Sequence, residues 1–264
     1  MQRHPIRWAV LPKYQLVAWF AGLRVGRMKV GVAGVGKWGV NLVRTLDDLG
    51  VETETFDPNQ PSTISSYSEL LGSVDKVMIA SPPEHHFRMV LAAVRKKIPV
   101  FVEKPFVLTH RDALWIAEQT FSQIHVGHVL LHAEGFQKAK TDDPKRYEAW
   151  RAGNNPGYHD VSAWWDLAVH DVAACVDLFG KPTNITSVQT FETYEAWLEW
   201  PTKTARLQGS RIHDSKEWKI SFDGKAYDPY SEKTEPLLLE VEAFLDGYDN
   251  LQHALNVVQT LERA

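Results

Sequence analysis

The 264-residue sequence has a single cysteine, Cys175, and no run of about 20 apolar residues. One cysteine excludes a disulfide framework and a cysteine-based zinc site, and it fits a reducing cytoplasm. Without a long apolar run, no segment is expected to cross a membrane. Lysine and arginine total 29 against 33 acidic residues, so the basic excess of a nucleic-acid binder is missing. With 44% hydrophobic and 23% charged residues, the chain has the composition of an ordinary globular protein.

The first 27 residues differ in character from the rest of the chain. They are basic and partly apolar, but Pro12 and Lys13 interrupt the apolar run and no small-residue cleavage site closes it. A strand-like segment begins at Met28. We therefore expect residues 1–27 to be a non-essential extension, with a signal peptide as the alternative.

A glycine-rich loop comes directly after this first strand. Residues 28–33 are rich in valine, residues 37–49 have helical spacing, and residues 51–56 alternate like a strand. In such a loop the first glycine permits a sharp turn, the second lets a pyrophosphate approach, and the third lets the helix pack closely. The helix N-terminus adds free N–H groups. The pattern predicts a dinucleotide site at Gly34, Gly36, Lys37, Trp38 and Gly39.

Asp57 stands 18 residues after Gly39, at the end of the second predicted strand. A carboxylate there suits the 2′-hydroxyl of the adenosine ribose and would repel a 2′-phosphate, which favours NAD over NADP. The alternative is that Asp57 only forms the turn before Pro58.

Strands and helices continue to alternate through the first half of the chain. Strands are predicted at 76–80, 99–102 and 125–131, with helices at 84–97 and from an N-cap at Thr109. Alternation of this kind predicts an α/β fold with a doubly wound parallel sheet. Ligands bind at the carboxyl ends of the strands in such sheets. Here those ends carry Gly34, Asp57, Ser81 and Lys104.

The second half changes pattern. Helices are predicted at 143–152, at 166–179, from Pro236 onward and at 253–263. Strands are predicted at 185–200, 204–212 and 216–222, and Asp223-Gly224 predicts a hairpin turn after the last of these. Successive strands of this kind favour an open antiparallel sheet.

Several motifs resemble the Gfo/Idh/MocA oxidoreductases. They are KVGVAGVGKWG from Lys29, SPPEHH from Ser81, VFVEKP from Val100, VGHVLL from Val126, and an aspartate four residues before a histidine, Asp166 and His170. The resemblance spans about residues 28–264. It implies a Rossmann domain at 28–131 and a shortened α+β substrate domain at 132–264, with an open, mostly antiparallel sheet. The last helices would pack back on the first domain.

The segments GKWGVNLVRTLDDLG, VGHVLLH and WWDLAVHDV are similar to the nucleotide-sugar branch of that family. This likeness implies hydride transfer from a UDP-N-acetylhexosamine or its uronate. The family also implies a homodimer or homotetramer formed through the open sheet. The stretch between Leu131 and Trp164 is short for the family, and Lys97 replaces its usual glycine.

Asp166 and His170 share one face of the predicted helix. Oxidising a secondary alcohol needs a base for the hydroxyl proton, and histidine, with a pKa near 6.5, suits that task. Asp166 could orient the ring or bind a sugar hydroxyl. An ordinary i,i+4 surface pair is the alternative.

The resemblance assigns further residues. Lys104, between Glu103 and a family cis-proline at Pro105, would stabilise a developing alkoxide, although a solvated loop lysine is the alternative. Near the cofactor the resemblance places Ser81, Pro82, His86 and Glu103, and near the substrate it places His128 and Trp165. His86 could instead be a polar residue at a helix start, and His128 and Trp165 could belong to the core. The 11 histidines show no metal-ligand spacing, so no metal is expected.

The sequence thus predicts an NAD-dependent sugar dehydrogenase. A free polyol or monosaccharide is the alternative substrate. A non-catalytic dinucleotide-binding sensor on the same fold is the alternative function, since one fold carries many functions.

Overall fold

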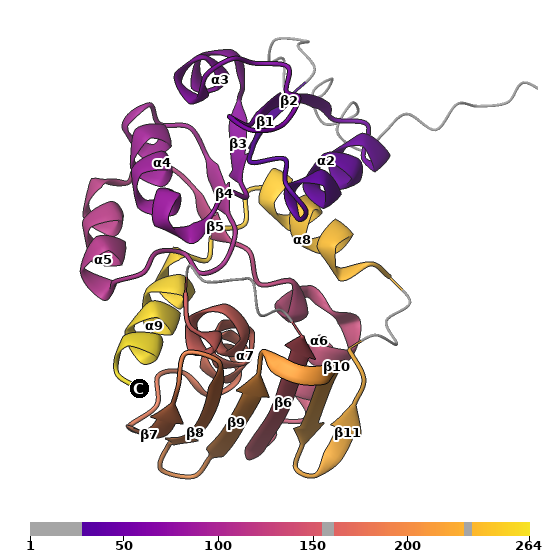
Figure 1. Cartoon of the computed structure of the whole chain (residues 1–264), viewed down its shortest axis with the longest axis vertical. Helices are drawn as coiled ribbons and strands as arrows, with labels where there is room; N and C mark the ends of the chain where they lie inside the picture. The colour runs from indigo at the N-terminus through magenta and orange to yellow at the C-terminus, as the bar shows by residue number, and fades with distance from the viewer. Residues whose placement is uncertain (1–27, 155–160, 230–233) are drawn as a thin grey trace, which may run out of the picture.

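Five parallel strands form the first sheet of the computed structural model, which describes residues 28–154, 161–229 and 234–264 (Figure 1). Their order is β2-β1-β3-β4-β5. The strands are β1 (Lys29–Ala33), β2 (Glu52–Phe56), β3 (Lys76–Ile79), β4 (Val100–Val102) and β5 (Ile124–Val126). The parallel order confirms the predicted doubly wound sheet. Strand order reverses between β1 and β3, which is where sheets of this type bind ligands.

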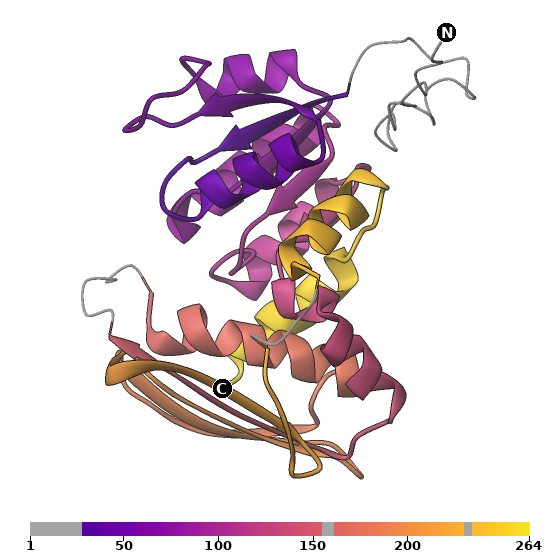
Figure 2. The ribbon, with the colours of Figure 1, turned by 90° about the vertical axis from the view of Figure 1, so that its right-hand side faces the viewer.

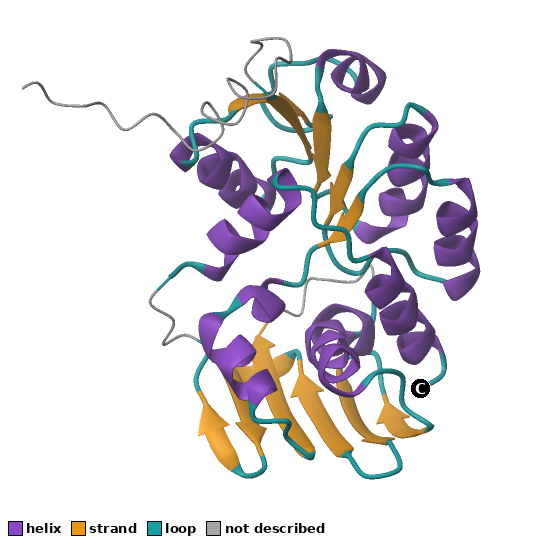
Figure 3. Cartoon of the chain, turned by 180° about the vertical axis from the view of Figure 1, so that it is seen from behind, coloured by secondary structure: helices purple, strands orange, loops and turns teal. Residues whose placement is uncertain are grey.

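Helices cover both faces of this sheet (Figure 3). One apolar core joins β1 to α2 (Gly39–Asp48) and to α8 (Pro236–Leu245), which returns from the C-terminal part of the chain. The core of the opposite face is completed by α3 (Tyr67–Ser73), α4 (Pro83–Arg95), α5 (His110–Gln119) and α9 (Leu251–Glu262). The predicted N-cap of α5 is confirmed, because the Asp112 backbone N–H donates to Thr109 Oγ1 at 3.1 Å.

A six-stranded sheet forms the second layer, in the order β11-β10-β6-β9-β8-β7. Its strands are β6 (Arg146–Asn154), β7 (Asn184–Gln189), β8 (Thr193–Glu199), β9 (Thr204–Ser210), β10 (Ile212–Phe222) and β11 (Lys225–Tyr227). All the described pairs are antiparallel except β6 with β9. The mostly antiparallel sheet is therefore confirmed, and so is the hairpin at Asp223 and Gly224, which both have positive φ.

Three predictions of secondary structure were wrong, two in the second sheet and one at the end of β5. The helix expected at 143–152 is the central strand β6, because Tyr147 and Ala149 alternate with outward residues and are buried under a helix. The strand expected at 185–200 is a hairpin, with the turn fastened by the Thr193 N–H to Thr190 Oγ1. The strand expected at 125–131 ends at Val126 and is followed by the 3₁₀ helix η1 (Val129–His132).

Helices cover one face of the second sheet, and in the described part of the chain the opposite face carries none (Figure 2). The covering layer holds α6 (Glu134–Thr141), a π-helical turn η2 (Trp164–Ala168) and α7 (Val169–Phe179). Helix α9 lies beside α7 and contributes residues to the cores of both sheets. None of the described helices combines the length and the apolarity needed to cross a membrane.

Candidate active site

The glycine loop brings helix α2 very close to strand β1. A Cβ placed on Gly39 would lie 1.8 Å from the carbonyl oxygen of Gly34, and Gly34 itself has φ +93°. A Cβ on Gly36 would meet nothing within 4 Å. Gly34 and Gly39 are therefore required by the fold, whereas Gly36 leaves open space beside the helix N-terminus, where a pyrophosphate could bind.

Two alanine variants separate these roles. Gly36→Ala is expected to keep the wild-type Tm but to lose at least about tenfold in affinity for a dinucleotide, because its methyl group occupies the phosphate approach. Gly39→Ala is expected to lower Tm itself, because the helix must move off the strand. Thermal unfolding and NADH fluorescence titration measure the two effects. Unchanged NADH affinity in Gly36→Ala would contradict this assignment of the loop.

Two cavities meet at Ala80 and Ser81, at the carboxyl end of β3. The larger, about 530 Å³, is also lined by Gly34, Gly36, Asp57 and Pro82. The smaller, about 300 Å³, is also lined by Trp38, Glu103, Lys104, Asp166 and His170. A dinucleotide laid along the strand ends would place adenosine in the larger cavity and nicotinamide in the smaller. The shared wall at Ser81 thus joins the predicted cofactor residues to the predicted catalytic residues.

Asp57 accepts hydrogen bonds from backbone N–H groups beside the larger cavity. Its Oδ2 accepts the Val35 N–H at 2.9 Å, and its Oδ1 accepts the N–H groups of Asn59 and Gln60 at 2.7 and 3.1 Å. The carboxylate therefore forms the turn, as the alternative interpretation expected, and also lines the cavity. His85 and Arg88, which the sequence analysis did not select, line the same cavity.

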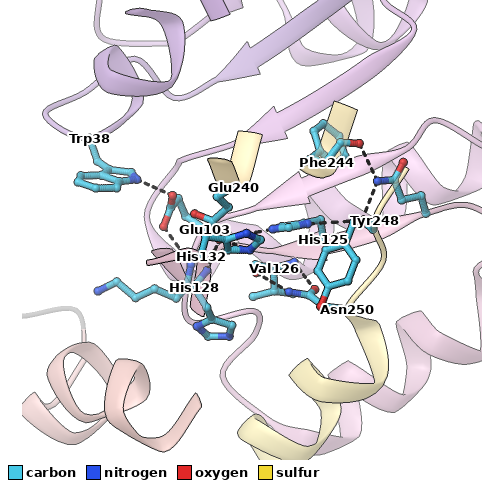
Figure 4. Close-up of polar contacts among 12 residues, drawn as sticks. Trp38, Glu103, His125, Val126, His128, His132, Glu240, Phe244, Tyr248 and Asn250 are labelled. Carbon is cyan, nitrogen blue, oxygen red and sulfur yellow. Dashed lines mark hydrogen bonds and ion pairs between the residues drawn. The ribbon is translucent and has the colours of Figure 1, made fainter. Parts of the chain in front are cut away.

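Lys37 and Trp38, which stand between the second and third glycines of the loop, line different cavities. Trp38 lines the smaller cavity and donates from Nε1 to Glu103 Oε1 at 2.5 Å (Figure 4). Burial and the neighbouring Glu240 carboxyl raise the pKa of Glu103 to about 7. Lys37 instead lines a third cavity, on the far side of Asp166.

Lys104 and Asp166 form an ion pair between the two sheets. Lys104 Nζ donates to Asp166 Oδ1 at 2.9 Å and to its backbone oxygen at 3.0 Å. Both side chains are about one-fifth exposed, at 20% and 18%. The other carboxylate oxygen of Asp166 lies 3.5 Å from Arg211 Nη2. The ion pair fixes the lysine at the cavity wall, and the Lys104–Pro105 peptide is cis, as the resemblance implied.

His170 is the second residue of helix α7, which directly follows the π-helical turn that carries Asp166. Its ring lines the smaller cavity, and its buried Nδ1 is without a hydrogen-bond partner among the described residues. Burial, Arg151 and Lys104 hold the pKa of His170 well below its usual value. The ring is therefore neutral at pH 7, which a general base requires.

Five predicted site residues line neither of these two cavities: Lys37, Gly39, His86, His128 and Trp165. His86 is fully buried and bridges two carbonyls, with Nδ1 2.8 Å from Pro105 O and Nε2 2.9 Å from Ser81 O. It ties together the loops after β3 and β4, so any effect on a cofactor is indirect. His128 is buried against the His253 ring, and Trp165 packs between the cores of the two sheets.

A cation-rich cavity that the sequence analysis missed adjoins Asp166. It is lined by Lys37, Arg151, Arg211 and Lys216, with Asp166 and Glu217 as the acidic members. Arg151 is held by the fully buried Asp171, whose Oδ2 accepts from Nε at 3.2 Å, and it stacks on Trp218. A surplus of guanidinium and ammonium groups suits a phosphate-bearing ligand. These residues come from loops and strands far apart in the sequence, so no local motif indicated them.

Known proteins resemble this chain in sequence and in fold. Residues 28–128 match the GFO_IDH_MocA family model, described as "Oxidoreductase family, NAD-binding Rossmann fold". The chain is 26% identical over 211 residues to UDP-N-acetylglucosamine 3-dehydrogenase of Acidithiobacillus ferrooxidans, covering 70% of this chain and 67% of that protein.

Two solved structures share the fold. UDP-N-acetylglucosamine 3-dehydrogenase GnnA from Acidithiobacillus ferrooxidans superposes with a TM-score of 0.81 at 20% identity, covering 90% of this chain and 96% of that one. The WlbA (WbpB) dehydrogenase from Thermus thermophilus, solved with NAD and UDP-GlcNAcA, has a TM-score of 0.77 at 14% identity, covering 90% and 95%.

Proposed function

We propose that this chain, whose residues 28–128 belong to the Gfo/Idh/MocA oxidoreductase family, is an NAD-dependent dehydrogenase that oxidises a secondary hydroxyl of a nucleotide sugar. One observation carries the proposal. Lys104, Asp166 and His170 all line the smaller cavity. The smaller cavity meets the larger one at Ser81, and Asp166 also lines the cation-rich cavity. A cofactor, a reacting hydroxyl and the anionic diphosphate of the substrate would each have a place there.

The residues fit a dinucleotide. Gly36 leaves room for the pyrophosphate, and the two cavities that meet at Ser81 lie along the strand ends. When bound, NAD would supply the hydride acceptor. The chain's own residues do the rest: neutral His170 takes the hydroxyl proton, and the Lys104 ammonium stabilises negative charge developing on the same oxygen. Asp166 holds Lys104 in place.

The nucleotide-sugar substrate rests on the cations beyond Asp166. A sugar whose C–H and O–H reach Lys104 and His170 would extend its diphosphate toward Arg151 and Arg211. Guanidinium groups bind phosphate oxygens in bidentate fashion. The relative that is 26% identical over 211 residues carries a UDP-sugar in its name, in agreement with this placement.

A substrate panel tests the proposal. The purified chain is incubated with NAD and UDP-N-acetylhexosamines, their uronates, free polyols or free monosaccharides, with 2-oxoglutarate as an external oxidant. We expect NADH formation with a UDP-sugar. Turnover of free polyols alone would remove the nucleotide-sugar substrate and keep the mechanism. Dinucleotide binding without turnover of any compound would support a sensor instead.

Asp57 is proposed to select NAD over NADP, because its carboxylate faces the larger cavity. NADH is expected to bind at least about tenfold more tightly than NADPH, since a 2′-phosphate would meet like charge. Asp57→Asn removes the negative charge and keeps the size of the side chain. It is therefore expected to reduce the preference for NADH over NADPH. Fluorescence titration of both cofactors measures it. Equal affinities in the unaltered protein would contradict selection by Asp57.

A further inference from the structure

Three potential metal ligands converge from three separate elements beside the smaller cavity. His125 lies on β5, His132 ends η1, and Glu240 lies in α8 (Figure 4). Glu240 Oε1 is 3.4 Å from His125 Nε2 and 3.8 Å from His132 Nε2, and the ligand atoms of all three lie within 4.8 Å of one another. More than one hundred residues separate His132 from Glu240, so the sequence spacing did not indicate the cluster.

The carboxylate of this cluster is buried without a full counter-charge. Glu240 is 1% exposed, and its Oε1 accepts the His128 backbone N–H at 2.6 Å. Glu103 is a second buried acid nearby, and burial together with the Glu240 carboxyl raises its pKa. Burial of a carboxylate is unfavourable unless a cation or a proton compensates its charge. The two imidazoles reaching Glu240 are nitrogen donors, the type of ligand that transition metals favour.

The surroundings of His125 suit coordination through Nε2. Its Nδ1 faces the Tyr248 carbonyl oxygen and its Nε2 faces Glu240 Oε1, both at 3.4 Å, so a metal ion on Nε2 would leave the ring proton on Nδ1, where the carbonyl accepts it. The lone pair of Nε2 then points at Glu240. A backbone carbonyl on the opposite nitrogen is the usual support of a metal-binding histidine. Phe101 stacks on the ring at 5.0 Å and fixes its plane.

We propose that His125 Nε2, His132 Nε2 and the Glu240 carboxylate bind a divalent transition-metal ion, with Zn²⁺ as the best match. Ligand bonds of 2.0–2.2 Å in a tetrahedron place donor atoms about 3.3–3.5 Å apart. The His125–Glu240 distance of 3.4 Å already fits, and the His132–Glu240 distance of 3.8 Å needs only a small approach. The fourth position is available to water, and Glu240 also lines the smaller cavity. The ion would fasten α8 to β5 behind that cavity.

Cobalt spectroscopy of the full chain tests the site. After treatment with a chelator, the protein is titrated with Co²⁺ and the visible d–d absorption is recorded, followed by displacement with Zn²⁺. We expect one Co²⁺ per chain, the strong absorption of a tetrahedral site, and loss of that absorption with Zn²⁺. Zn²⁺ is also expected to raise Tm, since a ligand that binds only the folded state stabilises it.

Two ligand variants and one control separate the site from general metal binding. His132→Gln and Glu240→Gln are expected to weaken Co²⁺ binding by at least about a hundredfold. Glu240→Gln keeps an acceptor for the His128 N–H. His213→Gln removes a histidine on β10 and is expected to change nothing. Weak, octahedral-type absorption in the folded wild type, or wild-type binding by His132→Gln, would overturn the proposal.

Discussion

Replacing Lys104 with methionine is expected to lower kcat about a hundred- to a thousandfold with the substrate that the panel identifies. Methionine keeps much of the volume and removes the ammonium that Asp166 holds at 2.9 Å. The lost interaction is one that strengthens as charge develops on the substrate oxygen, so the loss falls on kcat rather than on cofactor binding. Stopped-flow measurement of NADH formation gives the rate, and NADH titration is expected to give an unchanged Kd.

A matched variant guards this test. Lys96→Met makes the same change at an exposed lysine beyond the end of α4, whose Nζ contacts only the Ser68 carbonyl among the described residues. It is expected to turn over at the wild-type rate. If Lys104→Met also keeps turnover within about threefold of wild type, Lys104 has no catalytic role. A threefold loss is smaller than the loss expected when an electrostatic interaction with the transition state is removed.

The pH profile of kcat/KM is expected to carry the signature of His170. In the proposed mechanism the base is the neutral His170 ring, so activity falls when the pH drops below the pKa of that ring. Burial, Arg151 and Lys104 all favour the neutral ring and lower that pKa. The acid limb should therefore lie below about pH 6.5, the ordinary value for histidine. Between pH 6.5 and 7.5, protonation of His170 is expected to cause no change in kcat/KM.

His170→Asn completes this prediction. The variant is expected to lose about a hundred- to ten-thousandfold in kcat/KM and to lose the acid limb as well. His110→Asn, at the start of α5, removes a histidine outside both cavities and is expected to keep the profile. An acid limb that persists unchanged in His170→Asn would assign the base to another group. An acid limb well above pH 6.5 in the wild type would contradict the lowered pKa of His170.

The mechanism and the metal-ion proposal can fail separately. Lys104 and His170 are tested by rates, whereas His132 and Glu240 are tested by cobalt absorption and by Tm without any substrate. An inactive protein that binds Co²⁺ tetrahedrally would keep the metal site. An active protein without that absorption would keep the dehydrogenase.

Local sequence signals predicted the first sheet and its cofactor loop. The glycine spacing at Gly34, Gly36 and Gly39 needs only one strand, one turn and one helix, all within about 30 residues. Buried parallel strands such as β3 and β4 also have short continuous apolar runs. The strand ends then place Asp57, Ser81 and Lys104 at one edge, because parallel strands share a direction. The order of the residues alone determines that much.

Tertiary structure decided which side chains meet between the two sheets and in the second sheet. Residues 143–152 have helix-forming composition, yet they form β6 because Tyr147 and Ala149 gain more by burial under α7. Asp166 faces Lys104 and Arg211 across the two sheets, although its spacing suggested an interaction with His170. The partners of Arg151, Arg211, His132 and Glu240 lie far from them along the chain. Periodicity reports which face of an element is buried, whereas the packing of distant elements determines the charge that each buried group meets.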